Sequence, residues 1–334
     1  MVLMGMKLFI VVVTGVALLL ALLPNVIYFL ARLLSGPCNF SVRYKPFAIA
    51  SLIAVVVWIA MAAYGHFYSR FQSKLTSVTL SFRNLPPDFD GYRIVQISDL
   101  HLDGWEGHDE ELDKIIQKIN SLNADAVFFT GDIVSLTDEE LPHFLPLLSK
   151  IKAKDGVFSI LGNHDYLPYM RQWTARERRQ RLQNVISMER NVLHWQLLMN
   201  QNAVLRHGND SIAILGSENQ SLSLHSVIRR GNLAKTLRGT DGMFRILLTH
   251  DPSHWRGEVL GKPDIPLTLS GHTHGGQVCF FGRFYLSGLF YREHAGLYQD
   301  NGQYLYVNTG IGSTMPMRIG NPAEITLITL KAAR

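Results

Sequence analysis

The sequence centres on a glycine-rich stretch that holds two histidines, Ser270-Gly271-His272-Thr273-His274-Gly275-Gly276-Gln277. An apolar run typical of a β-strand, residues 265–269, leads into it. The glycines allow the backbone to turn sharply and to approach another group closely. His272 and His274 can then present two imidazoles to neighbouring metal positions, since imidazole suits zinc, iron and similar ions. Such a pair is a weak signal by itself, because His-x-His also occurs in ordinary surface loops.

Four further segments repeat this form, in which a short apolar strand ends in residues of metal-ligand type. They are Asp99-Leu100-His101, Gly131-Asp132, Gly162-Asn163-His164-Asp165 and Thr249-His250-Asp251. The strands expected before them cover residues 92–98, 126–130, 157–161 and 244–250. In open α/β sheets, ligand sites form beyond the carboxyl ends of the strands. The repetition therefore predicts one site that is assembled from five loops.

The segments between these motifs alternate between strand and helix patterns. A strand is expected near residues 78–82, before the first motif. Residues 109–122 place their leucines and isoleucines on one helical stripe, and residues 141–151 form a second expected helix. This β-α-β-α-β order predicts a layered α/β domain.

In this order, the motifs Asp-x-His, Gly-Asp, Gly-Asn-His-Asp, His and Gly-His-x-His resemble the calcineurin-like metallophosphoesterase superfamily. The resemblance covers roughly Val78 to the C-terminus. It implies an α/β (α+β) fold, a four-layer α/β/β/α sandwich. The tail Gly275-Gly276-Gln277 and the apolar N-terminus are most similar to a small bacterial membrane-associated branch. That branch includes enzymes that hydrolyse UDP-2,3-diacylglucosamine in lipid A synthesis.

The resemblance also implies a site for two divalent metal ions. Such a pair neutralises phosphoryl oxygens and makes hydroxide available near pH 7. Asp132 is the expected bridging ligand. The remaining expected ligands are Asp99, His101 and His274 for one ion, and Asn163, His250 and His272 for the other. This mixed donor set suits Mn²⁺, Fe or Zn²⁺ better than Mg²⁺, which prefers oxygen ligands and retained waters.

His164 directly follows Asn163, so it can face the same pocket without being a ligand. We expect it to stabilise the phosphoryl charge or to protonate the leaving oxygen, with Asp165 as a residue that orients it. Water or hydroxide is the expected nucleophile. Many superfamily members continue the second motif as Gly-Asp-x-x-Asp, where the second Asp supports the histidine. Ser135 occupies that position here, which leaves Asp165 or a backbone carbonyl to support His164 and argues against the protein Ser/Thr phosphatase branch.

Two uncharged apolar runs precede this domain and predict membrane helices at about 8–31 and 47–66. The first run exceeds the roughly 20 apolar residues that span a bilayer. A cleaved signal peptide is an alternative for it, but the apolar region of a signal peptide is usually only about 7–15 residues long. For the second run, a buried core helix is the alternative. We therefore expect a membrane anchor over residues 1–75 and a metallophosphoesterase domain over residues 76–334.

Charge leaves the orientation of this hairpin open, because three basic residues lie in or beside the connector and three lie on the flanks. The 334-residue chain is 47% hydrophobic, is 18% charged and has a net charge of +5. This mild basic excess fits an anionic substrate or a membrane surface and is too small to indicate a nucleic-acid partner. The basic segment 170–200 fits either a cap over the substrate, a surface for anionic headgroups, or a solvated helix. The apolar segment 278–291 fits either a hairpin on the core or a loop that faces lipid.

Together these features predict a membrane-anchored, metal-dependent phosphoesterase that hydrolyses a phosphodiester or pyrophosphate bond. Its expected partners are the lipid bilayer and an anionic phosphoester, with the glycolipid UDP-2,3-diacylglucosamine as the leading candidate. That substrate would place the protein in a bacterial inner membrane with its catalytic domain in the cytoplasm. A general phosphodiesterase or phosphatase for soluble nucleotides would share every ligand. A non-catalytic membrane binding protein is a third alternative, and the complete ligand set counts against it.

Overall fold

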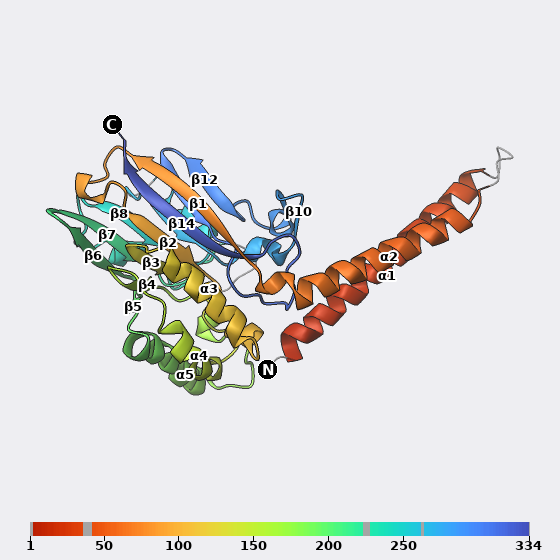
Figure 1. Cartoon of the computed structure of the whole chain (residues 1–334), viewed down its shortest axis with the longest axis horizontal. Coiled ribbons are helices and arrows are strands. Elements are labelled where there is room, and N and C mark those ends of the chain that lie inside the picture. Colours follow the sequence, from red (N-terminus) through yellow and green to blue (C-terminus); the bar gives the residue numbers. More distant parts are fainter. Residues whose placement is uncertain (1–2, 36–41, 223–227, 262–263, 334) are drawn as a thin grey trace.

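The computed structural model describes residues 3–35, 42–222, 228–261 and 264–333. It comprises an α/β domain and a pair of long helices that extends from one side of the domain (Figure 1). The layered α/β domain and the apolar N-terminal helix pair expected from the sequence are both confirmed.

The first sheet has six strands in the order β1-β14-β2-β3-β4-β5. Their bounds are β1 Ser73–Phe82, β14 Ala323–Ala332, β2 Arg93–Ile97, β3 Ala126–Phe129, β4 Val157–Ser159 and β5 Gln196–Leu197. All neighbours are parallel except β14 and β2. β1 begins at Ser73, earlier than the strand expected at residues 78–82, because it pairs over its whole length with β14.

The second sheet also has six strands, in the order β12-β13-β9-β8-β7-β6. Their bounds are β12 Gly296–Asp300, β13 Gln303–Val307, β9 Leu267–Ser270, β8 Phe244–Leu248, β7 Asp210–Gly216 and β6 Gln201–His207. The four inner strands are parallel, and an antiparallel strand closes each edge. The carboxyl ends of β8 and β9 therefore deliver the histidine motifs to one edge.

Helices cover the outer faces of both sheets, which makes four layers. A continuous apolar core, which includes Phe128 and Ile214, fills the space between the sheets. Helices α3 Asp109–Ser121, α4 Leu141–Leu148 and α5 Ala175–Ser187 pack on the first sheet. The second sheet is covered by the short helix α6 Leu233–Thr236 and the turn Trp255–Val259. The basic segment 170–200 is helical only in part, because residues after Val192 leave the helix and reach β5.

The N-terminal helices run antiparallel to each other (Figure 1). α1 spans Leu3–Ser35 and α2 spans Lys45–Phe67, so both are longer than the runs expected at 8–31 and 47–66. Both are long and apolar enough to cross a membrane by length and composition. α2 is not a core helix, because its buried residues are Ser51, Ala62 and Gly65 and most of its apolar surface is exposed.

The helix pair is fixed to the domain by a loop between β13 and β14. Met317 and Ile319 of this loop form a buried apolar cluster with Ala62 of α2 and with Val278, which precedes the short hairpin β10 Cys279–Phe280 and β11 Phe284–Tyr285. Gly65 is required here, since a Cβ at that position would lie 2.8 Å from the Met317 side chain. The same loop reaches the site described next.

Candidate active site

The residues of the five motifs gather where the strands of the two sheets end. Several of them have a left-handed backbone, which non-glycine residues rarely adopt. They are Asp99 (φ 52°), His101 (φ 44°), Asp132 (φ 59°), His272 (φ 73°) and His274 (φ 51°). Each such residue costs on the order of 1–3 kcal/mol unless its surroundings hold it. Backbone hydrogen bonds supply that hold, for example from Asp99 N–H to the Gly131 carbonyl at 2.9 Å.

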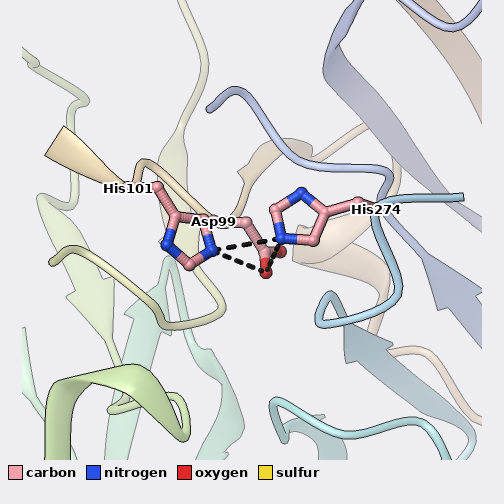
Figure 2. Close-up of side chains that lie close together, drawn as sticks. All are labelled: Asp99, His101 and His274. Atoms are coloured by element: carbon pink, nitrogen blue, oxygen red, sulfur yellow. Dashed lines mark hydrogen bonds and ion pairs between the residues drawn. The ribbon is translucent and has the colours of Figure 1, made fainter. Parts of the chain in front are cut away.

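Asp99, His101 and His274 form a first cluster of metal-ligand type (Figure 2). The Nε2 atoms of the two imidazoles lie 3.1 Å apart, and the Nε2 of His274 lies 3.4 Å from the Asp99 carboxylate. Burial lowers the pKa of both histidines well below its ordinary value, and burial raises the pKa of Asp99 to about 6. Two neutral imidazoles therefore turn nitrogens toward each other and toward a carboxylate. A cation between them would relieve this arrangement.

A second cluster is formed by Asp132, His250 and His272, and the Asn163 side chain joins it. The Nε2 of His250 lies 3.0 Å from the Asp132 carboxylate, 3.1 Å from Asn163 Oδ1 and 3.3 Å from His272 Nδ1. Its Nδ1 is occupied by the Thr130 carbonyl at 2.8 Å. Burial lowers the pKa of His250, but the Asp132 and Asp99 carboxylates and the Thr130 carbonyl together outweigh burial and raise this pKa to about 10. The cluster thus favours positive charge at its centre.

Asp132 joins the two clusters through a single carboxylate oxygen. Its Oδ2 lies 3.0 Å from His250 Nε2 and 3.6 Å from His101 Nε2. Its Oδ1 accepts the His164 N–H at 2.8 Å. Burial raises the pKa of Asp132, yet the imidazoles of His250, His164 and His101 together outweigh burial and hold this pKa below its ordinary value. The carboxylate is therefore charged and faces both groups of histidines.

The donor atoms present fit two divalent cations. Ligand atoms about 2.0–2.2 Å from an ion lie roughly 3–3.5 Å from one another, and the separations between these donors fall close to that range. Every residue expected as a ligand from the sequence is brought to one of the two clusters or to the bridge between them. Nitrogen and oxygen donors in this mixture suit Mn²⁺, Fe or Zn²⁺.

His164 forms a third group of possible metal ligands with His101 and Asp132, and one of its ring nitrogens is already engaged. Its Nδ1 donates to the Ser135 carbonyl at 2.7 Å, so the direct support for the ring is a backbone carbonyl rather than the Asp165 side chain. The ring meets His101 edge-on at 4.7 Å between centroids and packs against the Tyr169 ring at 4.6 Å. With Nδ1 engaged, Nε2 is the ring nitrogen that remains for a substrate.

Asp165 organises the loops of the site. Its carboxylate accepts backbone N–H groups from Gly162, Asp132, Ile133 and Val134 at 2.8–3.2 Å. Burial, together with the neighbouring Asp132 carboxylate, raises its pKa to about 8. Its contacts tie the Asp132 loop to the loop of Asn163 and His164, so its effect on His164 runs through the backbone.

The structure places further residues at the site, beyond the ligands and catalytic groups that the sequence predicts. Tyr291 lies 3.1 Å from His272 Nε2 through its hydroxyl, and Ser135 Oγ lies 3.3 Å from His101 Nδ1. Arg318 is fully buried and donates to the carbonyls of residues 309, 310, 312 and 321. That loop supports Asp99, whose carbonyl accepts the Gly312 N–H at 2.7 Å. No local motif marks Tyr291 or Arg318, whereas Ser135 stands at a position of the second motif.

Comparisons with known proteins agree with this geometry. Residues 92–276 match the family described as calcineurin-like phosphoesterase. The uncharacterized metallophosphoesterase YkuE of Bacillus subtilis is 32% identical over 80% of this chain and 90% of its own length. The UDP-2,3-diacylglucosamine pyrophosphatase LpxG of Chlamydia trachomatis is 31% identical over 78% of this chain and 91% of its own length. A transmembrane protein with metallophosphoesterase domain from Bos taurus is 29% identical over 87% of this chain, which spans only 64% of the bovine protein.

Proposed function

The chain belongs to the calcineurin-like phosphoesterase family and is a metal-dependent phosphohydrolase. From this premise we propose that it is a membrane-anchored enzyme that uses two divalent metal ions to hydrolyse a phosphodiester or pyrophosphate bond. One observation carries the proposal. A single oxygen of Asp132 faces the histidines of both clusters, which is the arrangement that a bridging ligand requires.

In this proposal, Asp99, His101 and His274 hold one ion, Asn163, His250 and His272 hold the other, and Asp132 is shared. When bound, the ions would neutralise the phosphoryl oxygens and supply hydroxide near neutral pH. The metal is proposed to be Mn²⁺, Fe or Zn²⁺ from the donor types.

His164 is proposed as the general acid. The Ser135 carbonyl accepts from its Nδ1, which fixes the ring and leaves Nε2 as the nitrogen that would donate a proton to the leaving oxygen. Asp165 acts as a positioning residue, since its carboxylate holds the backbone of the loops that carry Asp132 and His164.

The helices α1 and α2 are proposed to form a membrane hairpin. The boundary between this hairpin and the catalytic domain is proposed to lie near residues 73–75, where β1 begins. Length and composition support this role, as does the likeness to transmembrane metallophosphoesterase proteins. The substrate is proposed to be a lipid-linked nucleotide, UDP-2,3-diacylglucosamine, on the strength of the likeness to LpxG. That substrate sets the proposed location, a bacterial inner membrane with the domain in the cytoplasm.

The test is an assay of the detergent-purified full-length protein with Mn²⁺ on UDP-2,3-diacylglucosamine, UDP-N-acetylglucosamine and a chromogenic phosphodiester. We expect turnover that a chelator abolishes and a strong preference for the acylated substrate. Comparable rates on all three would retain the phosphohydrolase and replace the lipid substrate by soluble phosphoesters. Absence of turnover on all three with saturating Mn²⁺ would contradict the catalytic proposal.

A further inference from the structure

A cavity of about 330 Å³ opens beside His164. Asp103, Ser135 and His164 contribute to its lining. The rest of its lining is mainly apolar and is contributed by Gly5, Leu8, Leu136, Tyr169 and Thr314. The volume lies at the lower end of the range of roughly 300–1,000 Å³ that is usual for ligand pockets. The cavity therefore brings the proposed acid His164 together with a mainly apolar lining.

The outer wall of this cavity belongs to the first turns of α1. This helix is 33 residues long, whereas about 20 residues span a bilayer, so its first turns are free to reach past the membrane. A Cβ on Gly5 would lie 3.1 Å from the Thr314 carbonyl oxygen, which shows how closely the helix approaches the site loops. Phe9 stacks on His66 of α2 at 4.9 Å and packs on the cluster that includes Met317. The start of α1 is thus fixed to the catalytic domain.

Beyond Leu8, the apolar surface of α1 continues away from the cavity. The Leu8 side chain lines the cavity and is 49% exposed, and the exposed apolar residues that follow it along α1 lead away from the domain. Exposed apolar side chains of α1 therefore continue from the proposed membrane span to Leu8, which lines the same cavity as His164. A hydrocarbon chain can follow this surface without crossing water, which makes burial of its methylene groups favourable.

We propose that the cavity binds a hydrocarbon chain of a lipid-linked phosphoester, which enters from the bilayer along α1 and presents its phosphoryl group at His164. This inference rests on the proposed function, and it assigns the apolar part of the cavity to the hydrocarbon chain of the substrate. Tyr169 forms the inner platform, because its ring packs on His164 and lines the cavity at the same time. Leu8 and Leu136 add apolar side chains to the lining of the cavity.

A second apolar surface lies beside the base of α2 and provides the competing location. Its exposed side chains are Phe280, Phe281, Phe284, Leu286, Leu289 and Phe290. This surface surrounds a separate cavity of about 400 Å³, and His294 is the histidine in its lining. It does not share a lining residue with the cavity beside His164, so the two locations can be distinguished by experiment.

The first experiment compares Leu8→Gln with Ile10→Gln in the full-length protein. Both positions are apolar and about half exposed, at 49% and 56%, but only Leu8 is among the residues that line the cavity. We expect Leu8→Gln to lower kcat/KM on an acylated phosphodiester in mixed micelles by on the order of tenfold. Its kcat/KM on bis(p-nitrophenyl) phosphate should change less than about twofold, and Ile10→Gln should leave both values near wild type. Equal losses on both substrates, or none on either, would overturn the inference.

The second experiment measures binding without turnover. A phosphodiester whose acyl chain carries a photoactivatable diazirine is irradiated with chelator-treated protein, and the labelled peptides are mapped. Label in residues 5–8 or at Leu136 and Tyr169 supports the inference, whereas label confined to residues 280–290 overturns it. If the label falls in the cavity but no substrate is hydrolysed, chain binding stands and the proposed function fails. If wild type hydrolyses the soluble diester and the label lies elsewhere, the phosphohydrolase activity stands and chain binding in this cavity fails.

Discussion

The two sides of the site are built in opposite ways. On the ligand side, Asp99, Asp132 and His250 are fully or almost fully buried and are held by short backbone loops at strand ends. On the α1 side, Leu8 is half exposed, and the helix contributes an apolar wall. In the proposals above, the ligand side would carry the chemistry and the α1 side would select the substrate that reaches it. Changes to the proposed metal ligands should lower the rate on soluble and lipid substrates alike, while changes on the α1 side should lower the rate on lipid substrates alone.

The largest expected effect comes from Asp132→Asn. The amide keeps an oxygen for the His164 N–H but removes the charge that faces both histidine clusters. We expect turnover of soluble and acylated substrates to fall together by roughly 10⁴-fold or more, since bound metals contribute several kcal/mol to the transition state. Rates and metal content by elemental analysis check this.

Asp241→Asn is the matched control, because the Asp241 side chain is 98% exposed and its ion-pair partner is Arg245, which belongs to neither histidine cluster. It should leave rate and metal content near wild type. A fully active Asp132→Asn protein with two bound ions would remove the bridging role.

His164→Ala tests the acid without touching a proposed ligand. The rate should fall by roughly 10²–10⁴-fold on both kinds of substrate, with metal content unchanged, because only proton transfer is lost. A substrate with a good leaving group, such as a nitrophenyl diester, should lose least, since its leaving oxygen needs little protonation. His143→Ala, at an exposed surface histidine, serves as the control. Loss of metal in His164→Ala would instead make His164 a ligand.

Arg318→Met is expected to have a smaller effect on both sides of the site. Its buried guanidinium holds the loop that supports Asp99, and the backbone of the same residue donates to the Gly65 carbonyl of α2 at 3.2 Å. Removing a partner of this kind typically costs 10–100-fold in metal affinity or activity. The melting temperature should also fall, because several buried carbonyls lose their donor. Arg318→Lys should restore part of the metal affinity, and an unchanged affinity and melting temperature in Arg318→Met would contradict the positioning role.

The ligand side could be predicted from the sequence because each motif directly follows a strand. The parallel strands β2 and β3 bring Asp99 and Asp132 to one edge of the first sheet. His272 follows β9 of the second sheet, and it is the resemblance of the ordered motifs to a known family that predicts its place beside them. The main sheets and the helix pair follow from the same local patterns. The exact ends of the strands do not follow from local patterns, since β1 begins at Ser73 only because the distant strand β14 pairs with it.

The α1 side could not be predicted in this way. Leu8 and Leu136 are ordinary apolar residues, and nothing local indicates that they line one cavity with His164. The role of Arg318 could not be predicted either, because a lone arginine usually remains in solvent. In the folded protein the loop surrounds its guanidinium with carbonyls. Such contacts depend on packing between segments that are far apart in the sequence.

Glu140 connects the two sides, and its substitution should have the smallest effect on activity. Its buried carboxylate accepts the N–H groups of Ser135, Leu136 and Thr137 at 2.7–3.0 Å. Ser135 supports His164 through its carbonyl, and Leu136 lines the cavity. Burial, and then the Asp103 carboxylate, raises the pKa of Glu140 from 4.5 to about 7. One carboxylate thus positions both the acid and the apolar wall.

The raised pKa gives a signed prediction for stability. The folded protein binds the Glu140 proton more tightly than the unfolded chain, so this stabilisation is complete below about pH 4.5 and is lost as the pH rises through about 7. The loss is on the order of 3 kcal/mol. Glu140→Gln should remove this fall, so that its melting temperature in detergent drops less than that of wild type between pH 5 and about pH 8, while activity changes less than about threefold. Glu139→Gln, at the exposed neighbouring residue, should keep the wild-type slope. Identical slopes in all three proteins would mean that Glu140 is ionised throughout and that the loop tolerates its charge.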